Sequence, residues 1–134
     1  MSFDLILTPL GDFDCLEDVP NNFVADPIGN AASIPGRLMP HMPGLTFEAS
    51  GHGVWESESG AVAVSYGRED PVTSIHLALY GDVGSLMPRV VDLAAAMNCR
   101  IIDCQTSEFY GAKTGEKSVS AWRRFRDKVF NLYT

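Results

Sequence analysis

The sequence has few cysteines, few basic residues and no long apolar run. Three cysteines stand among 134 residues, and no two of them have the C-x-x-C spacing of a zinc site. An odd number of cysteines does not suit a disulfide framework, so we expect reduced thiols and a cytoplasmic protein. No apolar stretch approaches the roughly 20 residues that cross a bilayer, and the opening MSFDLILT lacks the basic region of a secretory signal. These absences predict no metal and no membrane association.

Basic residues are scarce relative to acidic ones. Ten lysines and arginines stand against 17 aspartates and glutamates, which gives a net charge of -7. Before residue 99 the imbalance is larger, because 13 acidic residues meet only three basic ones. The negative electrostatic field of these excess carboxylates repels phosphate, so we expect no binding to nucleic acid. It favours encounter with a basic protein partner.

An acidic cluster near the start of the chain is the candidate partner-binding surface. It consists of Asp12, Asp14, Glu17 and Asp18, and no basic residue precedes Arg37. The cluster lacks the 12-residue spacing, the central glycine and the final glutamate of an EF-hand, so we expect no calcium. A solvated loop that maintains solubility is the simpler interpretation, and pairing with the basic C-terminal segment is another.

Motifs of the common catalytic sites are lacking as well. The chain has no G-x-S-x-G, no G-x-x-x-x-G-K, no H-E-x-x-H and no G-x-G-x-x-G after a strand. None of its three histidines has a second histidine or a cysteine at ligand spacing. We therefore expect no cofactor and a non-catalytic protein, with a small enzyme as the alternative.

Apolar residues that alternate with polar ones predict six strands. The connections between 45 and 80 are short and rich in turn residues, which indicates an antiparallel meander, with Gly51-His52-Gly53 as one of its turns. The last two strands flank a helix and are expected to be parallel. The predicted strands span 2–8, 45–49, 54–58, 62–66, 73–80 and 100–104.

Two amphipathic helices and one long loop complete the predicted fold. The first helix has Ser85 as its expected N-cap and Pro88 in its first turn, and the second spans about 118–132. Residues 9–44 hold six of the eight prolines, and their apolar side chains predict a loop that packs on the sheet. We expect a single α+β domain over 1–134, with a mostly antiparallel sheet of five to six strands and two helices on one face.

His76 is the best candidate for a ligand site among the three histidines. It shares one face of the strand 73–80 with Tyr80, and Asp103 at the end of the strand 100–104 is expected to line the same pocket, between the long loop and the sheet. This arrangement would suit a small-molecule-binding domain or a small enzyme. A half-buried histidine with one hydrogen bond is the simpler interpretation.

Two stretches resemble small bacterial α+β proteins of unassigned function. The segment 2–7 is similar to their first strand, and the helix that leads into Ile101-Ile102-Asp103-Cys104-Gln105-Thr106 resembles a segment in which a strand ends in D-x-Q. Some of those proteins are similar to immunity proteins of bacterial toxin systems. The resemblance implies a small, cytosolic, non-enzymatic protein that acts by binding. Our main hypothesis is therefore an immunity-like or regulatory partner of a bacterial protein, and a third is an oligomer that pairs through an edge strand of the meander.

Overall fold

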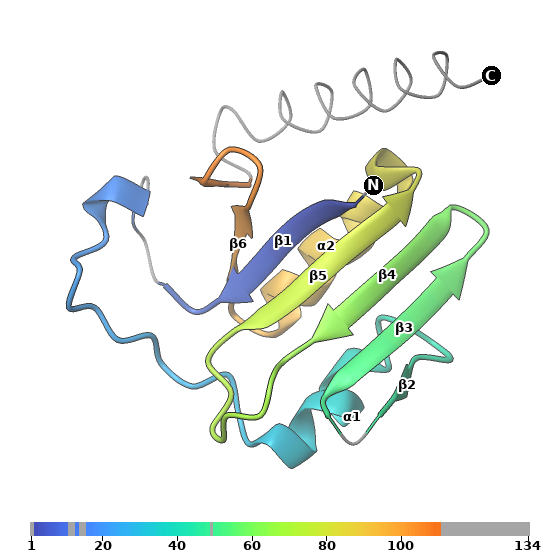
Figure 1. Ribbon diagram of the computed structural model, residues 1–134, viewed down its shortest axis with the longest axis horizontal. Coiled ribbons are helices and arrows are strands. Elements are labelled where there is room, and N and C mark those ends of the chain that lie inside the picture. The colour runs from blue at the N-terminus through green and yellow to red at the C-terminus, as the bar shows by residue number, and fades with distance from the viewer. Residues whose placement is uncertain (1, 11–12, 14–15, 49, 111–134) are drawn as a thin grey trace.

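The computed structural model describes residues 2–10, 13, 16–48 and 50–110 (Figure 1). Seven strands form one antiparallel sheet in the order β2-β3-β4-β5-β1-β6-β7. The α+β class is confirmed, with a sheet slightly larger than expected. The strands are β1 (Phe3–Thr8), β2 (Thr46–Phe47), β3 (His52–Ser57), β4 (Gly60–Ser65), β5 (Ile75–Gly81), β6 (Arg100–Asp103) and β7 (Glu108–Phe109). The helices are α1 (Ile34–Leu38) and α2 (Val83–Ala96), with short 3-10 turns η1 (Leu16–Asp18) and η2 (Ala31–Ser33).

The first strand of the chain lies in the interior of the sheet. β1 pairs antiparallel with β5 on one side and with β6 on the other. β5 and β6 therefore run parallel to each other, as the intervening helix suggested, but they do not pair, because β1 lies between them. Phe3, Leu5 and Leu7 are fully buried on this strand. Its alternating apolar residues suit an interior position, where one face of the strand meets the core.

One face of the sheet makes the core. The inward residues of β5, Ile75, Leu77 and Leu79, are fully buried, and α2 covers them with an apolar stripe that includes Leu86 and Val90. Figure 1 shows α2 behind β1 and β5. Two helices thus contribute to one core cluster, as expected, but the helix that joins α2 there is α1 and not the predicted C-terminal helix. The segment 118–132, where the second helix was predicted, lies outside the described residues.

The proline-rich segment contributes to the same core. Ile28, Ile34, Leu38 and Met42 belong to the cluster, and the N–H of Ile28 donates to the carbonyl of Val72 at 2.7 Å. The residues from Ile28 onward are therefore packed in the core, and they include η2 and α1, where only a loop was predicted. The described residues before this point are less buried, and the side chains of Phe23 and Val24 are exposed.

The start of α2 differs from the prediction. Asp82 is the N-cap, and its carboxylate accepts the Ser85 N–H at 3.4 Å and the Ser85 hydroxyl at 2.6 Å. Ser85 is thus the partner of the cap, and Pro88 lies inside the helix. Aspartate is as good a cap as serine, and the wider stripe of buried residues extends the helix back to Val83. Asn98 follows the helix with a positive φ of 55°, which suits the predicted end.

The predicted turn at Gly51-His52-Gly53 is wrong. His52 and Gly53 already belong to β3, and the chain reverses just before, where the N–H of Gly51 donates to the carbonyl of Glu48 at 3.1 Å. Gly51 supplies the positive φ of 78° that this reversal requires. Gly53 has a different role, because a side chain there would collide with the carbonyl oxygen of Thr46 on the neighbouring strand.

Candidate functional site

The second face of the sheet has no covering helix in the part of the chain that the structure describes (Figure 1). His76 and Tyr80 lie on this face, as their spacing in β5 predicted, and both are exposed. Ser65 and Ala61 of β4 lie opposite them in register. An antiparallel sheet with one face on the core commonly has the other in contact with water. We call this second face the open face.

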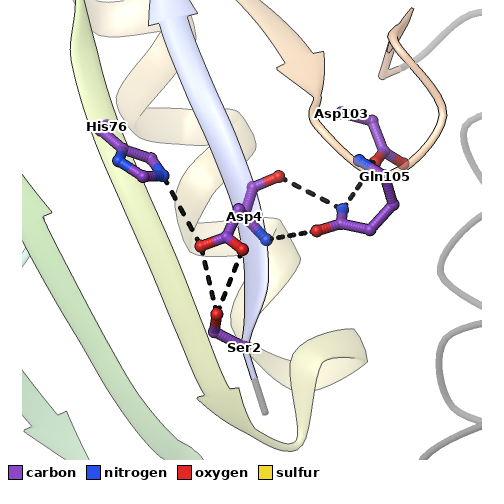
Figure 2. A network of polar contacts seen from close by, with 5 residues as sticks. All are labelled: Ser2, Asp4, His76, Asp103 and Gln105. Carbon is purple, nitrogen blue, oxygen red and sulfur yellow. Dashed lines mark hydrogen bonds and ion pairs between the residues drawn. The ribbon is translucent and has the colours of Figure 1, made fainter.

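A small polar group joins β5 to β1 on the open face. The Nε2 atom of His76 lies 3.6 Å from Oδ1 of Asp4, and the hydroxyl of Ser2 donates to Oδ1 and Oδ2 of Asp4 at 3.2 and 3.1 Å (Figure 2). In a hydrolase triad the serine hydroxyl donates to the histidine, which removes its proton. Here the serine donates to the carboxylate instead. The arrangement therefore presents hydrogen-bonding groups on a surface and does not activate Ser2 as a nucleophile.

Asp103 lies on the other side of the sheet from His76 and Tyr80. It stands opposite Leu5 in register and is 1% exposed. Its Oδ1 atom accepts the backbone N–H of Gln105 at 2.9 Å and the side-chain Nε2 of Gln105 at 2.6 Å. The structure therefore brings His76 and Tyr80 to one face, and it gives Asp103 contacts that orient Gln105 (Figure 2).

Gln105 is the residue whose role sequence reasoning missed. Its Oε1 accepts the backbone N–H of Asp4 at 2.8 Å, and its Nε2 donates to the carbonyl of Asp4 at 3.2 Å. The side-chain amide thereby adds two hydrogen bonds to β1 after β6 has ended, beside the backbone N–H of Cys104, which donates to the same carbonyl at 3.1 Å. The D-x-Q pattern at 103–105 was the available signal, and its role in this structure is to join the end of β6 to β1.

The acidic cluster is described only in part. Glu17 and Asp18 lie in η1 and are exposed, whereas Asp12 and Asp14 lie outside the described residues. No arginine or lysine forms an ion pair with Glu17 or Asp18 within the described residues. The assignment of this cluster to partner binding stays a prediction.

Three of the four arginines among the described residues donate to backbone carbonyl groups. Arg37 donates to the carbonyl of Ile28, Arg89 to that of His41 at 2.7 Å, and Arg100 to that of Phe13 at 2.9 Å. Arg89 and Arg100 also lie over the rings of Trp55 and Phe109, at 4.7 and 4.0 Å from the ring centroids. Between described residues, the one ion pair is that of His76 with Asp4. These carbonyl and ring contacts fix the positions of the three guanidinium groups.

Two shallow depressions adjoin the edges of the open face. The first has a volume of about 430 Å³, and it is lined by β4, β5 and their connection, with Arg68 and His76 among its residues. The long loop does not contribute to this lining, although its residues Ala31, Ala32 and Pro35 line a neighbouring depression of about 350 Å³. The second, of about 400 Å³, lies beside β3 and is lined by Pro43, Gly44, Thr46, Val54, Trp55 and Glu56.

The two described cysteines have thiols that stay protonated near neutral pH. Burial raises the pKa of Cys99 to about 11, against a smaller opposing effect of Arg37. Burial, with the nearby carboxylates of Asp4 and Asp103, raises the pKa of Cys104. A thiol acts as a nucleophile or a metal ligand when it is deprotonated, so neither environment favours that chemistry. Nowhere in the described ranges do three His, Cys, Asp or Glu side chains gather as a metal site.

Comparisons with known proteins do not assign the chain to a family. No protein-family model, no curated protein and no solved structure matches it. No helix within the described residues is long and apolar enough to span a membrane. The likeness to immunity proteins stays a prediction from short segments, and the geometry and charge of the chain's own residues are the basis for a proposed function.

Proposed function

We propose that this protein is a non-catalytic domain that binds a basic protein, as an immunity-like or regulatory partner of a bacterial protein would. The charge of the chain up to Tyr110 carries the proposal. Up to Tyr110 the chain has 15 acidic residues and four basic ones, a net charge of -11. An acidic surface of this kind accelerates encounter with a basic partner and disfavours acidic competitors.

The polar group on the open face also suits a binding role. Ser2, Asp4 and His76 present donors and acceptors on an exposed surface, and the serine is bonded in the wrong order for nucleophilic catalysis. Cys99 and Cys104 are free thiols, as is usual in a reducing compartment. We accordingly place the protein in the cytoplasm, where an immunity-like protein would meet its target.

The test is capture of a partner followed by rate measurements. Tagged protein is incubated with lysate of its source at low and moderate salt, and stoichiometric partners are identified by mass spectrometry. The purified partner is then mixed with the wild type and with a variant in which Asp12, Asp14, Glu17 and Asp18 are replaced by lysine. We expect a basic partner, and an association rate that falls about tenfold or more in the variant and depends less on salt.

A matched control separates local from overall charge. Asp92 is exposed on α2, and the single change Asp92→Lys alters the overall charge by the same amount as the single change Glu17→Lys within the cluster, with which it is compared. This control is expected to change the association rate by about twofold or less, because screening weakens charges beyond about 10 Å. An acidic partner, or a rate that neither salt nor the fourfold substitution changes, would contradict the proposal.

A small-molecule site is the second candidate, favoured by one observation. The depression of about 430 Å³ has charged and polar residues in its lining, among them Arg68, Glu69, His76, Ser65 and Thr73. These groups suit a small polar ligand. A thermal-shift screen of metabolites tests it: a stabilising ligand whose effect is lost in His76→Ala and kept in Tyr80→Phe would favour this site over protein binding.

A further inference from the structure

The outer edge of β3 is covered along only half of its length. β3 spans six residues, but β2 pairs with it only at Gly53 and Val54. Figure 1 shows β2 beside the first part of β3, with the second part at the border of the sheet. No described strand pairs with the outer side of Trp55, Glu56 or Ser57.

The hairpin between β3 and β4 determines which backbone groups point outward. Ser57 and Gly60 are partners across a two-residue loop, and such a closing pair exchanges both of its backbone hydrogen bonds. Alternate residues then point their N–H and C=O groups to opposite edges, so those of Glu56 point away from β4. His52, four residues earlier, follows this alternation, because its carbonyl accepts the N–H of Glu48 on the outer side at 2.8 Å.

The chain cannot extend β2 to reach Glu56. In the register of the pair, Thr46 faces Val54, so a longer β2 would need Gly44 opposite Glu56. Gly44 instead has a φ of 87°, which turns the chain out of the strand. Pro43 precedes it and has no N–H, and its carbonyl accepts the indole N–H of Trp55 at 3.0 Å. The open half of the edge is therefore a consequence of the sequence before β2.

The space and the charge beside the open half of the β3 edge indicate which kind of segment can bind there. The depression of about 400 Å³ lies here, lined by Trp55, Glu56 and the residues that lead into β2. Glu56 and Glu58 are exposed, and neither forms an ion pair with a residue of the described chain. A second copy of the protein is disfavoured, because an antiparallel pair of β3 edges centred on Glu56 would place two carboxylates opposite each other.

We propose that the edge from Trp55 to Ser57 binds an extended, basic segment of the partner protein as an added antiparallel strand in line with β2. The N–H and C=O of Glu56 form the main-chain hydrogen bonds, and the carboxylate of Glu56 selects a lysine or arginine across the pair. Side chains of the added strand enter the depression beside Trp55. This inference rests on the proposed function, since it names where and in what conformation the basic partner binds.

The probe is a nine-residue synthetic peptide in which lysine alternates with valine or threonine. Isotope-labelled protein is titrated with it to millimolar concentration, and the backbone amide signals are followed by NMR. We expect shifts concentrated at Val54–Ser57 and slower hydrogen exchange of the Glu56 amide. A matched peptide with glutamate in place of lysine is expected to bind at least about tenfold more weakly, since opposite charges would become like charges across the pair.

Two variants separate the main chain from the charge. Glu56→Pro removes an N–H that does not bond to β4, and proline is tolerated at such an edge position. It is expected to weaken peptide binding about tenfold, and Glu56→Gln, which removes only the charge, about threefold. If the proline variant does not fold, peptides N-methylated at alternate residues serve instead: only the set whose N–H groups face β3 should lose binding.

The possible outcomes distinguish this inference from the proposed function. Peptide-induced shifts at Glu17 and Asp18 without any at Glu56 would overturn the edge site and leave the acidic surface as the binding site. Concentration-dependent shifts at Glu56 without peptide would assign the edge to a second copy and overturn the proposal. Equal binding of the glutamate peptide, or no binding at millimolar concentration, would also overturn it, and the association rates of the captured partner would still test the proposed function.

Discussion

The side-chain amide of Gln105 binds both backbone groups of Asp4, a residue 101 positions earlier in the chain. Its Oε1 accepts the N–H at 2.8 Å, and its Nε2 donates to the carbonyl at 3.2 Å. Asp103 orients this amide through a 2.6 Å hydrogen bond. Asp4 in turn faces His76 on the open face. Residues far apart in sequence thus form one connected polar network.

Replacement of Gln105 tests how much this contact stabilises the sheet. Gln105→Ala removes both hydrogen bonds to β1, and we expect the free energy of unfolding to fall by about 1–2 kcal/mol. Thr106→Ala, at the adjacent exposed position, is the control and is expected to change stability by less than about 0.5 kcal/mol. Urea unfolding followed by circular dichroism measures both. Equal stability of the two variants would show that the Gln105 contact is not stabilising.

Asp82 is expected to stabilise the start of α2 as its N-cap. Asp82→Ala removes the acceptor of the Ser85 N–H and hydroxyl, and it should cost about 1 kcal/mol. Asp82→Asn keeps a capping oxygen and should recover most of that loss. Thermal unfolding of the two variants decides the matter, and an equal loss in both would assign the effect to charge instead of capping.

Two glycines are expected to respond to alanine in opposite directions. Gly60 opens β4 at a φ of 148°, and a Cβ atom there would collide with the carbonyl of Tyr80, so Gly60→Ala should cost about 3 kcal/mol. Gly36 lies inside α1 with nothing near a Cβ atom, so Gly36→Ala should stabilise by about 0.5–1 kcal/mol. The midpoints of denaturant unfolding of the two variants, each compared with the wild type, test both expectations. Destabilisation by Gly36→Ala would mean that α1 does not behave as a regular helix.

Cys99 is expected to make stability depend on alkaline pH. Because its pKa is raised from 9.0 to about 11 in the folded protein, the unfolded chain loses the thiol proton first as the pH rises. The contribution of this thiol to stability is therefore complete below pH 9 and is lost as the pH rises through about 11. Urea unfolding at about pH 8 and about pH 10.5 measures the free energies of unfolding of the wild type and of Cys99→Ala. Relative to Cys99→Ala, the wild type should be less stable at the higher pH than at the lower one. A difference independent of pH would contradict the assigned shift.

Local periodicity was sufficient to predict most of the strands. The ends of β1 and β5 differ from the predicted ends by at most two residues. Such strands can be predicted because the alternate burial of apolar side chains depends on only a few consecutive positions. The same period placed His76 and Tyr80 on one face. β7 was not predicted, because a strand of two residues has no periodic pattern to detect.

The placement of Asp103 required knowledge of the pairing between strands. The sequence puts it at the end of β6, but its side of the sheet follows from its register opposite Leu5 in β1. A shift of one residue in that register would have moved it to the face of His76. The half-covered edge of β3 has the same origin, because it depends on how far β2 runs beside it.

By itself, the sequence determined the α+β class, the faces of its longer strands and the acidic balance of the protein, since composition and short-range periodicity encode these directly. The tertiary structure decided which strands are neighbours, that β1 separates β5 from β6, and that Gln105 meets Asp4. It also decided which face and which edge remain open. These features depend on hydrogen bonds and packing between residues far apart in the chain, and no local pattern specifies such partners.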